Sequence, residues 1–167
     1  MSQTLTNLIA IQGTREEVLK FFSEGLDAPF DDLYCDEEPE LEGLTLRSWI
    51  PGADERNIEE LDTKYNSSFD WWECQEDDED VTIVVGSFKS TPGIPYKWAQ
   101  KLDEKYPKLD FYLFSSSEEC TEYSKVSQHW EVTERIRPAL YPTKEDDKFY
   151  CEEVDKLRDR FFTFILN

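Results

Sequence analysis

The order of the strands and helices predicted for the first two thirds of the chain constrains its fold most. Residues 4–12 alternate well enough between apolar and polar side chains to predict a strand. Gly13 then precedes Thr14 and Glu17, whose spacing matches a capping box and predicts the start of a helix. The apolar face of this helix recurs at helical spacing and consists of Val18, Leu19, Phe22 and Leu26.

A hairpin, a second helix and a further strand follow in the same part of the chain. Strands are expected at about 68–75 and 81–88, on either side of the acidic run 76–80. A helix with one apolar face then ends at Pro107, and residues 109–114 predict the next strand. The order strand, helix, strand, strand, helix, strand is the split βαβ arrangement of ferredoxin-like sandwiches. We therefore predict an α+β fold with an antiparallel sheet that carries both helices on one face.

Several of these strands are apolar on both faces, and a sheet covered on one side only would leave the second face exposed to water. The last part of the chain offers a cover, because residues 144–165 predict a long helix. Its apolar stripe contains Tyr150, Val154, Leu157, Phe161, Phe164 and Ile165. We predict that this helix packs across the open face, with a homodimer as the competing solution. Residues 121–132 are expected to add an edge strand before it.

The chain is long enough for one domain, which we place at residues 1–167. It contains an acidic insertion at 27–66, where proline, glycine and clustered carboxylates interrupt the pattern, and a C-terminal extension at 121–167. Insertions of this length in a compact domain are disproportionately functional. At the end of the insertion, Ile58, Leu61 and Tyr65 are spaced as one face of a short helix.

The charge of the chain indicates what kind of partner it meets. It has 38 Asp and Glu against 18 Lys and Arg, a formal net charge of -20. This excess disfavours direct binding of nucleic acid or of an anionic membrane, because both require Lys and Arg. A basic protein is the natural partner. The N-terminus lacks the pattern of a signal peptide, so we expect the protein in the cytoplasm, and in the host cytoplasm if a phage encodes it.

Motifs for catalysis and for metal binding are weak. The only histidine, His129, falls in the expected edge strand, and no nucleophile motif accompanies it. The four cysteines form no metal-binding pair and are expected to be reduced. Residues 76–80 lack the alternating ligands and the glycine of a calcium loop. We therefore expect a protein that is not an enzyme and that holds no cofactor and no metal.

Three motifs resemble the YubB-type ferredoxin-like family of small phage and plasmid proteins. Asn7–Gly13 is similar to its first strand, Asp62–Asn66 to the element before its central hairpin, and Ser87–Pro95 to its proline turn. Tyr106-Pro107 and the strand LDFYLF then follow as in that family. The resemblance covers roughly residues 5 to 120. It implies the ferredoxin-like fold and an origin in a mobile element, and it carries over no catalytic residue.

The acidic clusters suggest a function as a surface recognised by a partner. An extended strand advances about 3.3 Å per residue, close to the phosphate spacing of about 3.4 Å along one DNA strand. Consecutive carboxylates can therefore imitate DNA in the basic groove of a host defence or nucleic-acid-processing protein, which the chain would inhibit. The expected contact residues are Glu76, Asp77, Asp78, Glu79, Asp80, Asp31, Asp32, Asp36, Glu37, Glu38, Glu59, Glu60 and Asp62. An acidic surface with no dedicated partner is the plainer alternative.

A second hypothesis is a ligand-binding or catalytic site in the region 63–72. The family-like motif lies there, next to two tryptophans of the hairpin. Its candidate residues are Thr63, Lys64, Tyr65, Asn66, Trp71 and Trp72.

Overall fold

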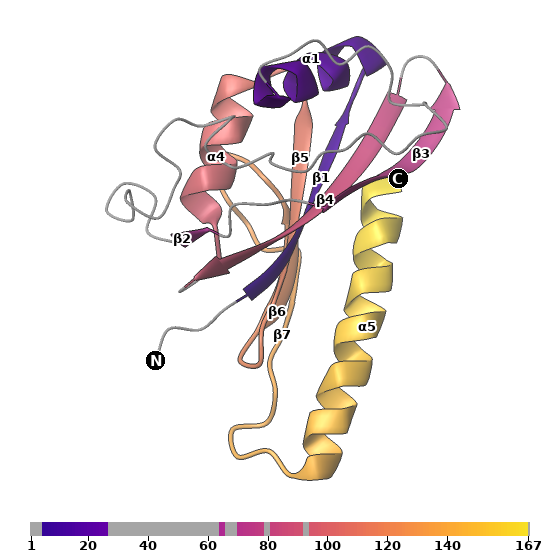
Figure 1. The fold of residues 1–167 in the computed structure, drawn as a ribbon. Helices are drawn as coiled ribbons and strands as arrows, with labels where there is room; N and C mark the ends of the chain where they lie inside the picture. The colour runs from indigo at the N-terminus through magenta and orange to yellow at the C-terminus, as the bar shows by residue number, and fades with distance from the viewer. Residues whose placement is uncertain (1–4, 27–63, 66–69, 79–80, 92–93, 167) are drawn as a thin grey trace.

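The structure is a computed structural model that describes residues 5–26, 64–65, 70–78, 81–91 and 94–166. These residues form an α+β fold, and the three helices among them pack on one antiparallel sheet (Figure 1). The elements are β1 (Leu5–Gly13), α1 (Arg15–Leu26), β2 (Lys64–Tyr65), β3 (Asp70–Asp78), β4 (Val81–Thr91), α4 (Tyr96–Lys105), β5 (Asp110–Ser116), β6 (Thr121–Lys125), β7 (Glu134–Ile136) and α5 (Lys144–Leu166).

The sheet is larger than the four-stranded core that the element order suggests. Its described part has seven strands: six follow the order β2-β4-β1-β5-β6-β7, and the seventh, β3, pairs with β4. The first and most central strand, β1, pairs antiparallel with β4 on one side and with β5 on the other. Both β2 and β3 therefore pair with the side of β4 that faces away from β1. The described part of the sheet ends at β7 on one edge and at β2 and β3 on the other.

The strand register separates the apolar residues into two cores, one on each face of the sheet. The first core lies under α1 and α4, where Ile11 is in register with Val84 and Phe111. Val18 of α1 is buried there as expected, and it is joined by Phe21 and by Trp98 of α4. These two helices thus cover one face of the sheet, as the sequence predicts.

The opposite face is covered by α5, which confirms the prediction for the C-terminal helix. Its buried residues Leu157, Phe161 and Ile165 share a core with Leu8 and Ala10 of β1 and with neighbouring strands. Figure 1 shows α5 running along this face, with its first turns extending beyond the sheet. The face is therefore buried within one chain, and the competing homodimer through it is not needed.

A buried polar network links the three strands in the middle of the sheet. The Asn7 side chain donates from Nδ2 to Ser90 Oγ at 2.9 Å and accepts from Ser115 Oγ at 2.7 Å. All three residues are buried, so the loss of one partner would leave a buried polar group unsatisfied. The network therefore favours the observed register of β4, β1 and β5.

Two predictions for local structure are wrong. Tyr65 lies in a strand and not in a helix, because Lys64 and Tyr65 pair with Thr91 and Ser90 of β4. The expected edge strand 121–132 ends at Lys125, and it is an inner strand because β7 pairs along its outer side. His129 therefore lies in an exposed loop, where its backbone N–H donates to Ser127 Oγ at 3.1 Å.

Candidate functional site

The acidic run 76–80 is only partly a hairpin tip. β3 continues through Asp78, so Glu76 is in register with Thr82 and Asp78 with Val81. The expectation of a tip that includes all five carboxylates is thus wrong for Glu76, Asp77 and Asp78, whose backbone is extended. Glu79 and Asp80 lie outside the described residues. So do eight other expected contact residues, namely Asp31, Asp32, Asp36, Glu37, Glu38, Glu59, Glu60 and Asp62.

β3 lies on the side of β4 that faces away from the centre of the sheet. It contains five of the acidic residues, namely Asp70, Glu73, Glu76, Asp77 and Asp78. Its register with β4 shifts between Glu73 and Gln75 and again between Glu76 and Asp78. Such irregularities bend a strand locally and discourage unwanted pairing of an edge.

The excess of negative charge belongs to one continuous part of the sequence. Residues 27–80, which we call the acidic segment, contain 20 of the 38 acidic residues but 3 of the 18 basic ones. The rest of the chain contains 18 acidic and 15 basic residues, so it is nearly balanced. An acidic composition spread evenly over the surface, as expected from a salt-adapted protein, would not give this distribution.

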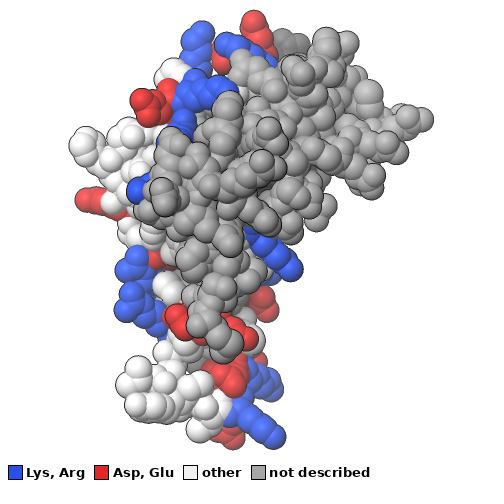
Figure 2. Space-filling view, turned by 60° about the vertical axis from the view of Figure 1, so that its left-hand side comes forward, with Lys and Arg blue, Asp and Glu red and all other residues white. Residues whose placement is uncertain are grey.

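The acidic residues of α5 are part of this balanced remainder. Lys156 contacts Glu153 at 3.2 Å, and Arg158 contacts Asp155 at 3.7 Å. Figure 2 shows Lys and Arg side chains interspersed with Asp and Glu on the described surface of one face. The carboxylates of α5 are therefore a weaker candidate for binding a basic partner than those of the acidic segment.

The alternative site at 63–72 is brought together only in part. β2 and β3 pair with the same side of β4, Tyr65 in register with Ser90 and Trp71 with Gly86. Lys64 and Trp72 are adjacent to them in the two strands. The structure thus places β2 and β3 along the same strand, β4. Thr63 and Asn66 lie outside the described residues.

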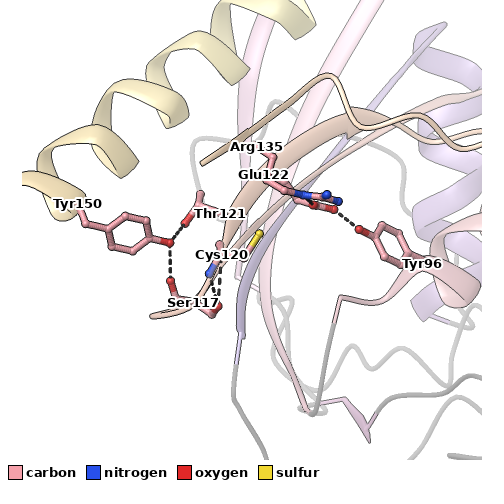
Figure 3. Close-up of polar contacts among 7 residues, drawn as sticks. All are labelled: Tyr96, Ser117, Cys120, Thr121, Glu122, Arg135 and Tyr150. Carbon is pink, nitrogen blue, oxygen red and sulfur yellow. Dashed lines mark hydrogen bonds and ion pairs between the residues drawn. The ribbon is translucent and has the colours of Figure 1, made fainter. Parts of the chain in front are cut away.

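A polar cluster that the sequence does not reveal joins α4 to the β6–β7 hairpin. The Glu122 carboxylate is buried and accepts hydrogen bonds from the Tyr96 hydroxyl and, at 2.5 Å, from Arg135 Nε (Figure 3). Burial is the main cause that raises the pKa of Tyr96, and its hydrogen bond to Glu122 is the second. The hydrogen bond that Arg135 makes to Glu122 raises the pKa of Arg135. Because both oxygens of Glu122 are engaged, this carboxylate is a structural link and is poorly placed to act as a general base.

The turn between β5 and β6 holds a second group of hydroxyls. Ser117 Oγ donates to Cys120 O at 3.1 Å and accepts from the Cys120 N–H at 3.2 Å. On the other side of the hairpin, Tyr150 of α5 donates to Ser117 O at 2.9 Å and is 2.9 Å from Thr121 Oγ1 (Figure 3). These bonds attach the first half of α5 to the turn.

An open pocket of about 460 Å³ lies between this turn and the start of α4. Its lining combines two aliphatic side chains with a thiol, a hydroxyl, a phenol, a carboxylate and a guanidinium, from Leu5, Ile94, Tyr96, Ser117, Glu119, Cys120 and Arg137. In the described part of the chain, no group of three or more His, Cys, Asp or Glu residues is arranged to hold a metal ion. Within the same residues, no helix is both long and apolar enough to cross a membrane.

Comparisons with known proteins give no relative for this chain. No protein-family model matches it, and neither does any curated protein or solved structure. The resemblance to the YubB-type family therefore stays a prediction.

Proposed function

We propose that the chain is a non-enzymatic interaction protein whose acidic segment binds a basic surface of a partner protein. The observation that carries this proposal is the concentration of charge, since residues 27–80 hold a formal charge of -17 out of -20. So high a local charge opposes folding through self-repulsion, and a basic partner would offset that cost. Outside residues 27–80, acidic and basic residues are present in nearly equal numbers, so this part of the chain gives no comparable reason to expect a basic partner.

The finer proposal is that the partner surface normally binds nucleic acid. Glu76–Asp78 are three consecutive carboxylate residues in the extended backbone of β3, and this gives a high density of negative charge along the chain, as the phosphates do along a DNA strand. A groove that binds DNA or RNA contacts the phosphates through Lys and Arg. The chain would occupy such a groove as a DNA mimic and inhibit a host defence or nucleic-acid-processing protein.

The fold and origin that the sequence resemblance implies are part of the same proposal. The order β3-β4-β1-β5 with α1 and α4 on one face is compatible with a ferredoxin-like core, to which β2, β6, β7 and α5 would be additions. A protein of a phage or plasmid would have a host defence protein as a natural target.

A capture experiment tests the proposal. The purified full-length chain is immobilised and incubated with a bacterial lysate at about 50 mM and about 200 mM salt, with and without added duplex DNA. We expect a basic, nucleic-acid-binding protein to be captured at low salt, and to be lost at high salt or when DNA is present. Capture that neither salt nor DNA reduces, or no capture of a basic protein, would contradict the proposal.

A further inference from the structure

The pocket between the β5–β6 turn and the start of α4 has the size of a small-molecule site. Its volume of about 460 Å³ lies within the range of about 300–1,000 Å³ that such sites have. Four separate parts of the chain line it, namely the start of β1, the start of α4, the β5–β6 turn and the residue that follows β7. All four lie outside the acidic segment, so a ligand in this pocket is a different question from the basic partner proposed above.

The walls of the pocket are held in place by hydrogen bonds. Ser117 bonds to both the carbonyl and the N–H of Cys120 and so closes the β5–β6 turn. The Glu122 carboxylate joins the Tyr96 hydroxyl of α4 to Arg135 of β7. In Figure 3 the Cys120 thiol points to the side of the hairpin on which Glu122 and Tyr96 lie. A site whose walls are already ordered loses less entropy when a ligand binds.

The polar groups of the lining are of two kinds, those that are engaged within the protein and those that are available to a ligand. The Ser117 and Tyr96 hydroxyls both donate to groups of the protein. The side chains of Arg137 and Glu119 are exposed, and within the described part of the chain neither forms an ion pair. The Cys120 thiol is only a weak donor. The pocket therefore offers a ligand one guanidinium and one carboxylate.

Two features favour a carboxylate as one group of the ligand. A guanidinium such as that of Arg137 binds a carboxylate through two parallel hydrogen bonds. The second feature is the start of α4, which forms part of the lining. Its N-cap residue, Pro95, has no polar side chain that could accept from the first N–H groups, so the partial positive charge of the helix end is not offset there by a side-chain cap.

We propose that this pocket binds an α-amino acid with an apolar side chain. Arg137 pairs with the carboxylate of the ligand, Glu119 pairs with its ammonium group, and Leu5 and Ile94 contact its side chain. A simple anion would meet the Glu119 carboxylate and the negative charge of the chain, and a simple cation would meet the Arg137 guanidinium. A zwitterion with an apolar side chain matches both charges and both aliphatic residues.

Binding should be weak, because the pocket is open and its two charged side chains are exposed. Ion pairs in such a setting are screened by water and salt. For a ligand of about ten heavy atoms we therefore expect a Kd of about 0.1–1 mM.

Titration of the isotopically labelled full-length chain with L-leucine, followed by amide chemical shifts in NMR, tests the inference. We expect saturable shifts at Glu119, Cys120 and Arg137. L-Leucinamide lacks the carboxylate, N-acetyl-L-leucine lacks the ammonium group, and glycine lacks the apolar side chain. Each should bind at least about fivefold more weakly than leucine, since each loses one of the three contacts.

Variants of the two charged residues assign these contacts. Arg137→Gln should weaken leucine binding at least about fivefold and leave leucinamide binding unchanged, because leucinamide has no carboxylate to lose. Glu119→Gln should likewise weaken leucine binding and not weaken that of N-acetyl-leucine. Glu118→Gln is the matched control, since Glu118 is an exposed neighbour of Glu119 that does not line the pocket, and it should bind leucine within about twofold of the original chain.

Three results would overturn the inference. The first is a chain without saturable shifts at the pocket in about 10 mM leucine or phenylalanine. The second is equal affinity for leucine, leucinamide and N-acetyl-leucine. The third is an equal loss of binding in the Glu118→Gln control and the Glu119→Gln variant. Because the substituted residues are exposed, all variants should unfold at the temperature of the original chain, and circular dichroism of the same samples checks this.

Discussion

Replacing Phe161 by alanine should destabilise the protein strongly, because this residue fixes α5 on the sheet. Its side chain has no exposed surface, and its ring centroid lies 5.6 Å from that of Phe114 and 5.8 Å from that of Tyr123. Truncation of a buried phenylalanine typically costs about 3–5 kcal/mol, from lost burial and from the cavity that remains. Since domains of this size are stable by only about 5–15 kcal/mol, Phe161→Ala should remove a large share of the free energy of unfolding.

Urea denaturation followed by far-ultraviolet circular dichroism measures this loss. Phe149→Ala is a matched control on the same helix, because Phe149 is 64% exposed, and its free energy of unfolding should change by no more than about 0.5 kcal/mol. Both proteins are measured at the same low micromolar concentration. A loss below about 1 kcal/mol for Phe161→Ala, or equal losses for the two variants, would refute the packing of α5 against the sheet.

Two further predictions concern the tyrosines Tyr96, which is half-buried, and Tyr123, which is buried. Tyr96→Phe removes a hydrogen bond to the buried Glu122 carboxylate, so the free energy of unfolding should fall by about 1–2 kcal/mol in urea denaturation, and an unchanged value would contradict the link between α4 and the β6–β7 hairpin. Burial is the main cause that raises the pKa of Tyr123 to about 12, and the hydrogen bond to Glu134 is the second. The folded state therefore keeps the hydroxyl proton of Tyr123 at a pH at which the unfolded chain releases it. The stability that this pKa difference contributes is therefore complete below about pH 10 and is lost between pH 10 and 12, at about 1.4 kcal/mol per pH unit. The variant Tyr123→Phe lacks this proton, so its free energy of unfolding should fall less over the same interval than that of the original chain.

Much of the fold follows from patterns that lie within single elements. The stripe through Val154, Leu157 and Phe161 has helical spacing, and the strands it covers are apolar on both faces. Together these two patterns predict both the helix and its location. In the core under α1 and α4, apolar spacing predicts Val18, whereas Phe21, which is also buried there, lies outside the predicted apolar face of α1.

The errors arise where pairing between strands decides the structure. Glu76 and Asp78 have low strand propensity, yet they pair with Thr82 and Val81, because pairing within the hairpin outweighs the preference of the single residues. β7 has only three residues and gives no periodic signal. Without β7, β6 is expected at an edge, and the length of β6 is overestimated.

The polar cluster around Glu122 escapes prediction for the same reason. Its members Tyr96 and Arg135 come from α4 and β7, and Arg135 is opposite Glu122 only because β6 and β7 pair in one register. A glutamate in a short strand otherwise looks like a solvent-exposed residue. Its burial is a consequence of the complete sheet.

The central claim is that the acidic segment binds a basic partner, and a pair of charge-matched variants tests it most directly. In one variant Glu76, Asp77, Asp78, Glu79 and Asp80 are changed to Gln and Asn. In the other, five exposed carboxylates of α5 are changed in the same way, namely Glu145, Asp147, Glu152, Asp155 and Asp159. Both variants lose the same net charge and should keep the fold.

The affinity for the basic protein captured from the lysate is then measured for both variants at several salt concentrations. We predict that the 76–80 variant binds about tenfold or more weakly and with a shallower dependence on salt, since exposed ion pairs contribute about 0.2–1 kcal/mol each. The α5 variant should bind within about threefold of the original chain. Equal weakening of the two variants, or unchanged binding by the 76–80 variant, would contradict the claim that this segment forms the contact.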